Sequence, residues 1–494
     1  MLTYALEERG KEPLYEFLYT KIREDILSGR ISRDEPIPSK RALAKHLNIS
    51  VITVENAYAQ LMTEGYIYSK PRSGFYAADI SDAVRYLDQC GMKEESHDRQ
   101  NAGSAGETAD TPASVFADFS SNQTQPDSFP FTIWARLSRK VLSEEKQQLM
   151  TNPPTEGIRQ LREAIAEHLR DFRGMHVSWE QVIVGAGTEY LYGLILQLLG
   201  LERIYALEDP GYRKVSQVCE AYGADVRRIP LDAEGLSVTA LEASGAQVVH
   251  VTPAHHFPTG ITMPAKRRYE LLRWAAQEPD RYVVEDDYDS EFRLSGRPMP
   301  TLFETDTADR VVYMNTFTKT LSSTIRISYM VLPVPLLHRF REKLRFYACT
   351  VPTFEQYTLA HFIKEGYFEK HINRMRTLSR KKRDLLLESI QRSALGRIAS
   401  VSEEHAGLHF LLVLHLNMPE ERFLEKLETK GIRFARMSDY ESGTPPLRRP
   451  GDSTQALSRG EGRSGRVFIM NYSSVPLERI PEAVARICAV LEKQ

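Results

Sequence analysis

Residues 316–326 read Thr-Phe-Thr-Lys-Thr-Leu-Ser-Ser-Thr-Ile-Arg, and Glu-Asp-Asp-Tyr-Asp stands upstream at residues 285–289. The first stretch supplies Lys319 and Arg326, and the second supplies Asp286. A lysine can form a Schiff base, a carboxylate can keep a pyridine nitrogen protonated, and an arginine can bind a phosphate. Together these groups are what pyridoxal 5′-phosphate (PLP) requires of a protein. Each residue alone is more often a solvated surface residue, so the prediction depends on their joint order along the chain.

The chain around this trio alternates short apolar runs with amphipathic helical patterns. Five runs predict buried strands, and they begin at Val182, Arg203, Gln247, Tyr282 and Val311. Helical patterns over residues 158–173 and 266–278 lie between some of them. This alternation predicts an α/β domain with a largely parallel sheet. A long basic helix over 366–393 with short strands then predicts a smaller α+β domain, interrupted by a mobile loop at 443–465.

The N-terminal residues predict a compact helical module. Apolar residues recur at helical spacing over 14–26, and Ser39 is a suitable N-cap for a second helix. A third helix follows, and we expect its inward stripe to be formed by Val51, Val54, Tyr58 and Leu61. A strand, a turn with a basic tip and another strand complete the module over 66–77. Three helices and a wing predict a winged helix-turn-helix, which is a DNA-binding fold.

The distribution of charge in this module supports that prediction. Its cations fall at a helix start and at the tip of the wing, where DNA phosphates would lie. The backbone contacts that we expect come from Ser39, Lys40, Arg41, Lys70 and Arg72. We expect base contacts from Thr53 and Asn56, on the outward face of the third helix.

The bulk composition is balanced. The chain of 494 residues carries 64 Lys and Arg against 66 Asp and Glu, which excludes a globally basic DNA binder. No apolar run approaches the ~20 residues of a membrane span, and the acidic N-terminus lacks an apolar signal core. The four cysteines, Cys90, Cys219, Cys349 and Cys488, show neither metal-ligand spacing nor a disulfide framework. We therefore expect a cytoplasmic protein without a membrane anchor or a metal site.

These patterns divide the chain into three parts. We predict a DNA-binding domain over residues 1–79, a flexible linker over 80–116 and an effector domain over 117–494. The linker is rich in small and polar residues. Such a segment cannot bury enough apolar surface to offset the entropy lost when it becomes ordered.

Several segments of the N-terminal module carry a family resemblance. They are Pro38-Ser-Lys-Arg-Ala-Leu-Ala-x-x-Leu, Thr53-Val-x-x-Ala-Tyr-x-x-Leu and Glu64-Gly-Tyr, with Arg72-Ser-Gly-Phe. They resemble the DNA-binding domain of GntR-type regulators. This family often has an arginine after the serine that opens the recognition helix, and Val51 stands there in this chain. Base readout is therefore expected to rest on Thr53, Asn56 or the wing.

The larger region carries a second resemblance. Its segments are Thr155-Glu-Gly-Ile-Arg, Val184-Gly-Ala-Gly-Thr-Glu-Tyr, Glu208-Asp-Pro-Gly-Tyr, Pro258-Thr-Gly-Ile and the stretch around Lys319. They resemble the fold-type-I aminotransferases, from about residue 118 to residue 490. The resemblance implies an α/β fold with a large parallel-sheet domain and a small α+β domain, and it implies PLP as the cofactor.

This second resemblance also implies roles for individual residues. Phosphate contacts are implied for Gly187, Thr188, Glu189, Arg326, Thr316 and Thr318. Tyr212 would lie near the cofactor ring, with Asp286 at the pyridine nitrogen and Tyr288 at the phenolate oxygen. Lys319 would form the internal aldimine. Arg466, in Gly465-Arg-Val-Phe-Ile, would hold the carboxylate of an effector.

One position departs from the aminotransferase pattern. Phe257 stands where the Asn-Pro-Thr-Gly motif of the family has its asparagine, which bonds the PLP phenolate oxygen. Because Phe257 cannot make this hydrogen bond, we expect transamination to be less efficient than in the family. The neighbouring His255 and His256 project in different directions, so we expect one of them to contact the ring and do not expect a metal pair.

The order of winged helix, linker and aminotransferase-like domain resembles the MocR subgroup of GntR regulators. It implies a transcription factor that senses an amino compound, or PLP itself, through aldimine exchange at Lys319. It also implies a head-to-tail homodimer that binds double-stranded DNA with paired half-sites. The alternative is a catalytically active aminotransferase with an accessory DNA-binding domain, since Lys319 could also act as a general base.

Overall fold

The computed structural model describes residues 2–4, 6–9, 13–70, 73–78, 115–121, 123, 125–293, 300–403, 407–442 and 465–491. The chain divides into two compact units, Met1–Ala109 and Asp110–Gln494. The predicted linker, apart from its last two residues, and the predicted loop over 443–465, apart from Gly465, lie outside the described residues. Arg72, at the predicted wing tip, lies outside them as well.

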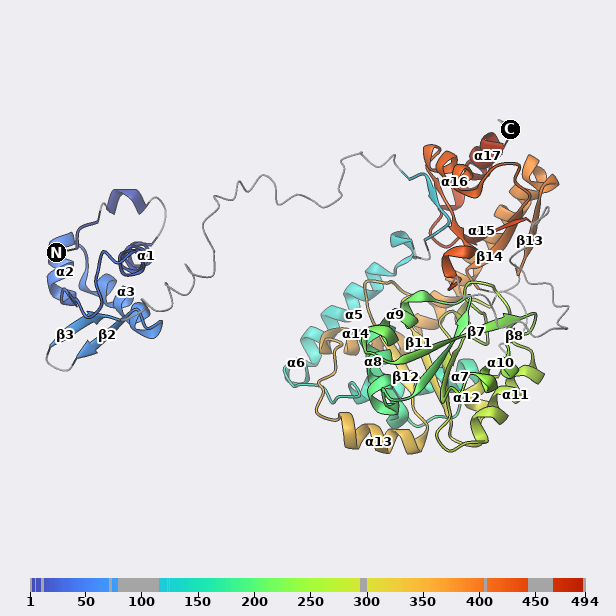
Figure 1. The fold of residues 1–494 in the computed structure, drawn as a ribbon, viewed down its shortest axis with the longest axis horizontal. Helices are drawn as coiled ribbons and strands as arrows, with labels where there is room; N and C mark the ends of the chain where they lie inside the picture. The colour runs from blue at the N-terminus through green and yellow to red at the C-terminus, as the bar shows by residue number, and fades with distance from the viewer. Residues whose placement is uncertain are drawn as a thin grey trace. The chain divides into compact units, whose positions relative to one another are not determined.

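The smaller unit is a helical module with a three-stranded antiparallel sheet (Figure 1, blue). Its elements are η1 (Leu6–Arg9), α1 (Leu14–Leu27), β1 (Pro36–Ile37), α2 (Lys40–Leu47), α3 (Val51–Thr63), β2 (Ile67–Lys70) and β3 (Gly74–Ala77). β3 lies between β1 and β2. This order confirms the predicted winged helix-turn-helix, with β2 and β3 as the wing.

Polar residues set the ends of the helices at the turn. Ser39 accepts a hydrogen bond from the backbone N–H of Ala42 at 3.3 Å, and Ser50 accepts one from Thr53 at 3.1 Å. Each bond satisfies an N–H group that the start of a helix leaves without a partner. Asn48 ends α2 in the left-handed conformation, which asparagine tolerates better than most residues. The turn between α2 and α3 is therefore fixed by local sequence.

The inward face of α3 differs from the prediction at one residue. The buried residues of α3 are Val54, Ala57, Tyr58 and Leu61. Val51, which we expected to face inward, is 42% exposed, and its neighbour Ile52 is 68% exposed. The core of the unit therefore begins one helical turn later than the sequence pattern indicated. Val51 is the first residue of α3 and belongs to its exposed start.

The larger unit is built on an eight-stranded sheet in the order β5-β12-β11-β10-β9-β6-β7-β8 (Figure 1). Its strands are β5 (Val182–Gly185), β6 (Ile204–Asp209), β7 (Asp225–Asp232), β8 (Gly235–Leu236), β9 (Val248–Val251), β10 (Tyr282–Asp286), β11 (Val311–Thr316) and β12 (Ser328–Val331). β12 is antiparallel to both of its neighbours, and β8 is antiparallel to β7. The other neighbouring pairs are parallel. All five predicted strands are present, so the largely parallel sheet is confirmed.

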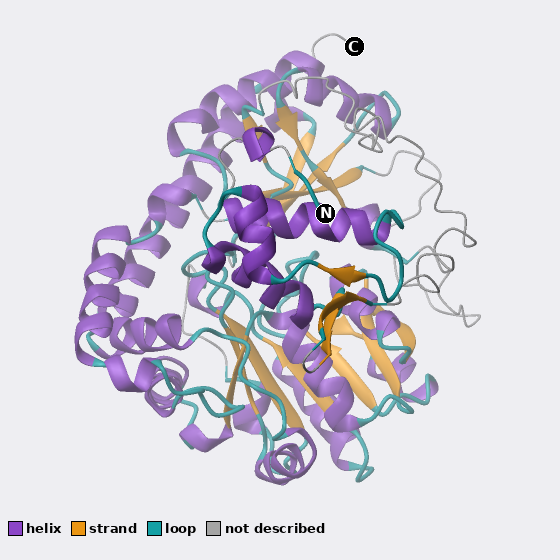
Figure 2. Cartoon of the chain, turned by 90° about the vertical axis from the view of Figure 1, so that its left-hand side faces the viewer, coloured by secondary structure: helices purple, strands orange, loops and turns teal. Residues whose placement is uncertain are grey.

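Helices cover both faces of this sheet (Figure 2). They are α5 (Phe131–Glu144), α6 (Lys146–Leu149), α7 (Arg159–Arg173), α8 (Thr188–Leu199), α9 (Arg213–Ala221), α10 (Val238–Ala243), α11 (Ala265–Ala276), α12 (Leu302–Thr305), α13 (Val334–Leu344) and α14 (Thr353–Lys364). Along β11, Val312 packs into one apolar core and Tyr313 into the core on the other face. Because both faces are buried, the central strands are continuous apolar runs in the sequence.

The chain after α14 forms the smaller domain of this unit. Its elements are α15 (Tyr367–Arg392), β13 (Ala399–Ser402), β14 (His409–Leu414), α16 (Glu420–Thr429), β15 (Ile432–Arg433), β16 (Ala435–Arg436), η6 (Met437–Tyr440), β17 (Arg466–Asn471) and α17 (Ile480–Leu491). The antiparallel order is β13-β14-β17-β16. β15 pairs in parallel with β4 (Ala117–Asp118), from the start of the unit. The long basic helix predicted over 366–393 is α15.

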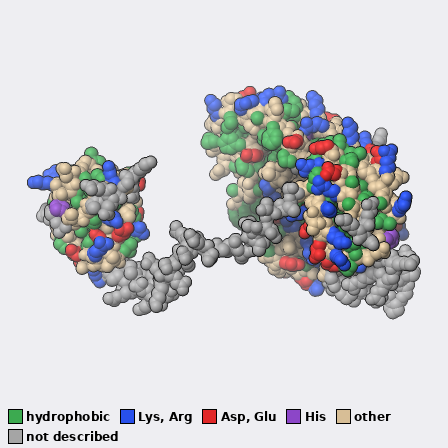
Figure 3. Space-filling view, turned by 90° about the horizontal axis from the view of Figure 1, so that it is seen from above, with side chains coloured by type: hydrophobic (Ala, Val, Ile, Leu, Met, Phe, Trp, Pro, Cys, Tyr) green, Lys and Arg blue, Asp and Glu red, His purple; other side chains and the backbone are tan. Residues whose placement is uncertain are grey.

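The surface of the larger unit carries mixed charge. Lys and Arg side chains are interspersed with Asp and Glu side chains over the face seen in Figure 3. This matches the near balance of cations and anions in the sequence. Within the described ranges, no helix has the length and apolar character needed to cross a membrane.

Candidate functional site

The sheet brings the segments that carry the predicted PLP ligands to one edge. Lys319 lies in the loop between β11 and β12, Asp286 is the last residue of β10, and Gly187 stands between β5 and α8. β10 and β11 are parallel neighbours, and β5 runs in the same direction because antiparallel β12 separates it from β11. The carboxyl ends of parallel strands meet at one edge of an α/β sheet, where ligands bind.

The amine of Lys319 loses its proton more readily than that of an ordinary lysine. Burial lowers the pKa of Lys319 to about 8, and the nearby ammonium of Lys214 acts in the same direction. The carboxylates of Asp289 and Asp286 oppose the shift. Since a neutral amine is the form that attacks an aldehyde, this lowered pKa favours formation of a Schiff base near neutral pH.

The two central acids of residues 285–289 face different surroundings. Asp286 is buried, its Oδ2 lies 3.6 Å from Nε2 of His250, and its Oδ1 has no hydrogen-bond partner. Asp287 is held by the core, because its Oδ2 accepts a hydrogen bond from Arg173 at 2.6 Å and another from the Tyr313 hydroxyl at 2.8 Å, although its Oδ1 also lacks a partner. Successive side chains along an extended chain point to opposite faces, and of these two carboxylates only that of Asp286 acts electrostatically on Lys319. Asp286 is therefore the carboxylate on the Lys319 side with an acceptor to offer a pyridinium N–H.

Three buried polar residues, Glu208, Thr252 and His256, lie together in the same region as Asp286. Oε2 of Glu208 accepts hydrogen bonds from the backbone N–H and the hydroxyl of Thr252, both at 3.0 Å, and lies 3.4 Å from Nε2 of His256. Burial raises the pKa of Glu208 to about 7 and lowers that of His256 to about 3, so His256 is neutral at physiological pH. The sequence contained Glu208 in a recognised motif, yet nothing in the pattern assigned a role to it or to His250.

Gly187 and Arg326 lie together at the start of α8, and we call this place the cradle. Gly187 has a φ of +95°, and a Cβ built on it would lie 2.4 Å from Nη2 of Arg326. The backbone can therefore approach the guanidinium only because residue 187 is a glycine. Thr188 begins α8, whose first N–H groups favour an anion. An arginine and a free helix start suit the phosphate of PLP, as the unpaired Oδ1 of Asp286 suits its pyridine nitrogen.

The carboxylate of Glu189 forms ion pairs with two cationic side chains at this cradle. Its Oε2 lies 2.9 Å from Nη2 of Arg326, and its Oε1 lies 2.8 Å from Nζ of Lys214. Burial opposes ionisation of Glu189, but hydrogen bonds from Lys214, its own backbone N–H and Arg326 outweigh that effect and lower its pKa to about 2. The Glu189 side chain is thus an acceptor that orients Arg326, and only its backbone N–H could donate to a phosphate. No sequence pattern predicted that Lys214 would lie at this site.

The hydroxyl of Thr316 is already hydrogen-bonded to Thr318 and Ser328. It donates to the Thr318 hydroxyl at 2.8 Å and accepts from the Ser328 hydroxyl at 2.8 Å and from the Thr318 backbone N–H at 3.1 Å. Thr318 is half-buried, and its hydroxyl still has a proton to donate. Of the two predicted hydroxyls, Thr318 is the one placed to serve a ligand.

The two tyrosines predicted to contact the cofactor, Tyr212 and Tyr288, have aromatic and histidine neighbours. Tyr212 is 43% exposed and meets the ring of Phe257 edge-on at 6.1 Å. The hydroxyl of Tyr288 lies 3.3 Å from Nδ1 of His255, which lies 2.8 Å from Oδ2 of Asp289. Phe257 has no polar group, so the position of the family's asparagine is apolar in this chain. His255 is the histidine that reaches the Tyr288 hydroxyl.

The structure does not bring Arg466 together with Lys319. Arg466 is the exposed first residue of β17, opposite Leu414, and its electrostatic partner is Glu420 of α16. Ile469 of the same strand packs against Phe257. Because side chains alternate along a strand, Arg466 lies on the face opposite Ile469. Binding of an effector carboxylate by Arg466 is a prediction that this placement does not support.

Over the described residues, no group of His, Cys, Asp and Glu side chains has the arrangement of a metal site. His255 and His256 have separate partners, since Nδ1 of His256 lies 2.7 Å from the Thr259 hydroxyl.

The residues of the smaller unit that we predict to contact DNA are mostly exposed. Arg41 and Asn56 are exposed, and Thr53 is half-buried with its hydroxyl 2.7 Å from that of Ser50. Lys40 is paired with Glu55 at 2.7 Å, which links α2 to α3. Nζ of Lys70 lies 4.4 Å from the centre of the Tyr76 ring on the wing. Lys40 must therefore leave or share Glu55 in order to bind a DNA phosphate.

Comparison with known families assigns both units. Residues 14–77 match the bacterial regulatory proteins of the gntR family, and residues 115–445 match aminotransferase class I and II. A winged helix joined to an aminotransferase fold defines a class of DNA-binding transcriptional regulators. This chain belongs to that class as a MocR-type member of the GntR family, with an aminotransferase class I and II domain.

Two curated relatives share nearly the whole length. The chain is 38% identical over 453 residues to an uncharacterised HTH-type transcriptional regulator, YdeL, of Bacillus subtilis, covering 92% of this chain and 95% of YdeL. It is 30% identical to the probable rhizopine catabolism regulatory protein MocR of Rhizobium meliloti, covering 97% and 99%. A solved structure with the same fold is the Pyrococcus horikoshii kynurenine aminotransferase in complex with PMP, with a TM-score of 0.64 and 22% identity over 86% of this chain and 97% of that one.

Proposed function

We propose that this regulator binds PLP at Lys319 and responds to a small amine or amino acid that competes with Lys319 for the cofactor. The observation that carries the proposal is the buried Oδ1 of Asp286, which lacks a partner at the sheet edge that also carries Lys319. When bound, PLP supplies an aldehyde that exchanges one amine for another and a pyridine ring that withdraws electrons. The Pyrococcus horikoshii enzyme, which shares the fold, holds PMP.

Each residue of the site would have a defined task toward the cofactor. Asp286 would accept a hydrogen bond from the protonated pyridine nitrogen, and Arg326 with the first N–H groups of α8 would bind the phosphate. The Tyr288 hydroxyl would donate to the phenolate oxygen. Lys319 would hold the aldehyde until an effector amine replaces it. The lowered pKa of Lys319 lets it both take and return a proton near neutral pH.

The smaller unit would bind double-stranded DNA. Ser39, Arg41 and Lys70 would contact phosphates, joined by Lys40 once it leaves Glu55. Thr53 and Asn56 would face the bases, and Arg72 would contribute from the wing. Since the matching family consists of bacterial regulators and bacterial DNA lies in the cytoplasm, we propose that the protein works in that compartment. The proposed boundaries are 1–79 for this domain, 80–116 for the linker and 117–494 for the effector domain. The family match at 14–77 lies within the first domain, and the match at 115–445 begins two residues before the proposed effector domain.

We propose a head-to-tail homodimer that binds paired half-sites. The support is a set of large apolar side chains exposed on the larger unit, namely Phe131, Leu142, Met150 and Phe346, which are 65%, 52%, 75% and 77% exposed. Such side chains suit a buried interface. An effector can shift DNA binding only if it has different affinities for two arrangements of the dimer.

Retention of the cofactor tests the central claim. Full-length protein would be incubated with PLP, dialysed and measured by the visible absorbance of lysine-bound PLP. We expect wild type and Lys381→Ala, an exposed lysine of α15, to retain PLP, and Lys319→Ala to lose it. Wild-type protein that retains no PLP would overturn the proposal. Affinity for its own upstream DNA, measured with PLP alone and then with amines and amino acids, separates a sensor of PLP from a sensor of an amino compound.

The lowered pKa of Lys319 also favours a second candidate, catalytic transamination with an accessory DNA-binding domain. The discriminating measurement is the amount of 2-oxo acid formed from an amino acid when a second 2-oxo acid is supplied. A regulator stops at no more than one product molecule per protomer, whereas an aminotransferase continues.

A further inference from the structure

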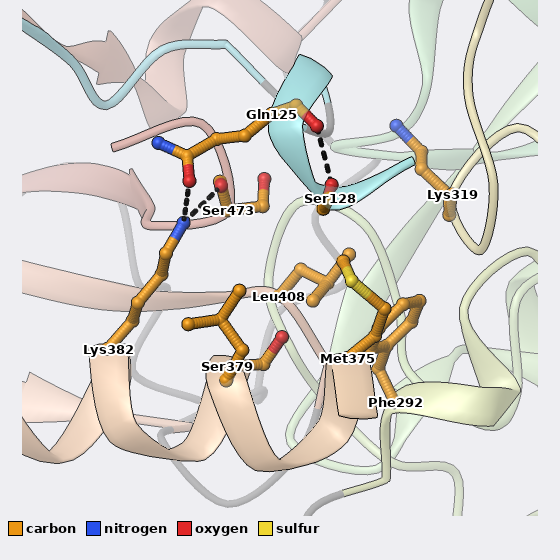
Figure 4. Close-up of a pocket in the computed structure, with 10 residues that line it drawn as sticks. Gln125, Ser128, Phe292, Lys319, Met375, Ser379, Lys382, Leu408 and Ser473 are labelled. Atoms are coloured by element: carbon orange, nitrogen blue, oxygen red, sulfur yellow. Dashed lines mark hydrogen bonds between the residues drawn. The ribbon is translucent and has the colours of Figure 1, made fainter. Parts of the chain in front are cut away.

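The space beside Lys319 is small, and Lys382, which lines it, is held by protein groups. The space has a volume of about 10 Å³, which is room for one water molecule. Lys382 donates hydrogen bonds to Oε1 of Gln125 at 3.1 Å and to the backbone carbonyl of Ser473 at 2.8 Å (Figure 4). A surface whose side chains are exposed to solvent lies instead on α3 of the smaller unit.

The outer face of α3 is a stripe of exposed side chains. Ile52, Glu55, Asn56 and Ala59 are exposed, and they follow the i, i+3, i+4, i+7 spacing that places residues on one side of a helix. We call these four residues the α3 stripe. In a helix-turn-helix the second helix lies in the major groove, and its N-terminal residues contact the edges of the bases. The first three residues of the α3 stripe occupy this position.

Ile52 is a large apolar side chain in the first turn of α3. It is 68% exposed, and the adjacent Val51 is 42% exposed. Val51 stands where the family often has an arginine, and α3 contains neither Arg nor Lys, the side chains that bind guanine in the major groove. An exposed apolar side chain gains free energy when another apolar group covers it. The apolar group that a base pair presents in the major groove is the C5 methyl group of thymine.

Glu55 is an anion on a helix that would enter the groove of a polyanion. Lys40 offsets this charge, because its Nζ lies 2.7 Å from Oε1 of Glu55 and also 5.6 Å from the centre of the Phe75 ring on the wing. Among the described residues, Oε2 of Glu55 has no hydrogen-bond partner. A carboxylate oxygen can accept from the N4 amino group of cytosine. The amino group of adenine suits it less, because the acceptor N7 lies beside that group.

We propose that Ile52 and Glu55 set the operator preference of this regulator, with Ile52 against the C5 methyl group of a thymine and Oε2 of Glu55 accepting from the N4 amino group of a cytosine. The inference rests on the proposed function, because the smaller unit must bind DNA. The two residues are separated by about 4.5 Å along the helix axis, against ~3.4 Å between base pairs. We therefore expect the thymine and the cytosine within about two base pairs of each other.

Selection from a library of random DNA duplexes tests the assignment. Full-length wild-type protein, incubated with PLP, and each variant would be allowed to bind the library, and the bound duplexes would be sequenced. We expect Glu55→Gln to lose the preference for one cytosine by about 5- to 100-fold, the range of one mismatched base pair. Ile52→Ala should lose the preference for one thymine. The preferences at the other positions of the selected site should not change.

The thymine methyl group is tested directly by replacing single thymines of the selected site with deoxyuracil, which lacks that group alone. Wild type should bind about fourfold more weakly when one particular thymine is replaced, as expected for one buried carbon. Ile52→Ala should bind the two duplexes equally. The affinities would be measured at one fixed salt concentration.

Two variants of α1 control for the loss of an apolar side chain and of a charge. Leu27→Ala removes an apolar side chain that is 37% exposed. Glu24→Gln removes a carboxylate that pairs with Lys21 at 3.2 Å, as Glu55 pairs with Lys40. Both variants should select the same site as wild type.

The outcomes separate this inference from the proposed function. If Glu55→Gln binds every sequence more tightly by the same factor, Glu55 acts through its charge alone and its role in base recognition is overturned. If Ile52→Ala selects the wild-type site and keeps the sensitivity to deoxyuracil, the role of Ile52 is overturned. Both results leave DNA binding intact. Wild-type protein that selects no sequence overturns the proposed binding of operator DNA and this inference with it.

Discussion

The two units build their functional surfaces in opposite ways. In the smaller unit, Ser39, Lys40 and Arg41 are consecutive residues at the start of one helix. In the larger unit, Gly187, Asp286 and Lys319 come from distant parts of the chain and meet where three strands end. A surface made of consecutive residues follows from helix geometry alone. A site made by a sheet depends on strand order, strand direction and the face to which each side chain points.

The strongest test of this contrast uses Asp286, the last residue of β10, and Asp287, which follows it. We expect Asp287→Asn to destabilise the larger unit by about 3–5 kcal/mol, because it leaves the buried guanidinium of Arg173 without its charged partner. Asp286→Asn should leave stability nearly unchanged and weaken PLP retention about 10- to 100-fold. Urea unfolding and PLP titration of both variants give the comparison. Equal losses of stability would show that both acids are structural.

The cradle at the start of α8 allows a matched test of two glycines. Gly187→Ala places a Cβ against Arg326, whereas Gly223, with a φ of +78°, has nothing within 4 Å of an added Cβ. Both substitutions should cost about 1–2 kcal/mol of stability, because both residues have positive φ. Only Gly187→Ala should also weaken PLP binding, by about tenfold. If Gly223→Ala weakens PLP binding as much as Gly187→Ala does, the start of α8 has no specific role in binding PLP.

The DNA-binding surface is expected to respond to salt, unlike the buried site. Lys40→Ala combined with Arg41→Ala should weaken binding of upstream DNA and reduce the slope of log K against log salt by about 1 for each lost phosphate contact. PLP retention should not change. Lys21→Ala, on α1, removes a cation paired with Glu24 at 3.2 Å and serves as the control. An unchanged slope in the double variant would contradict the phosphate contacts.

The smallest effect that we predict is a pH dependence of PLP uptake. The pKa of Lys319 is lowered to about 8, so its neutral amine becomes the major form above pH 8. The rate of PLP capture should therefore rise with pH up to about 8 and then level off, as followed by stopped-flow absorbance. A rate that keeps rising toward pH 10 would indicate the pKa of an ordinary exposed lysine.

The sequence predicted that Lys319, Asp286 and Arg326 act together from residue type and order, and the sheet places Asp286 and the loop that carries Lys319 at one edge. It predicted the central strands because burial on both faces leaves unbroken apolar runs. It did not predict β7, whose Asp225-Val-Arg-Arg-Ile start contains three charged residues, or β12, which returns directly after the Lys319 loop. Both strands depend on tertiary pairing more than on local pattern.

The orientation of individual side chains could not be predicted for the same reason. The face on which Arg466 lies is set by the register of β17 against β14 and β16, and no local spacing reveals that register. The same holds for His250, which reaches Asp286 only because β9 lies beside β10. Val51 was expected to face inward from its apolar character, but the buried face of α3 begins at Val54.

The alternation at the end of β10 has a consequence for how this chain can vary. Asp286 and Asp287 perform separate tasks because a strand presents consecutive side chains to opposite faces. A single inserted or deleted residue in β10 would exchange them, turning Asp287 toward the cofactor edge and Asp286 toward Arg173. Substitutions can adjust one task at a time, but a change of length at this strand would disturb cofactor binding and folding together.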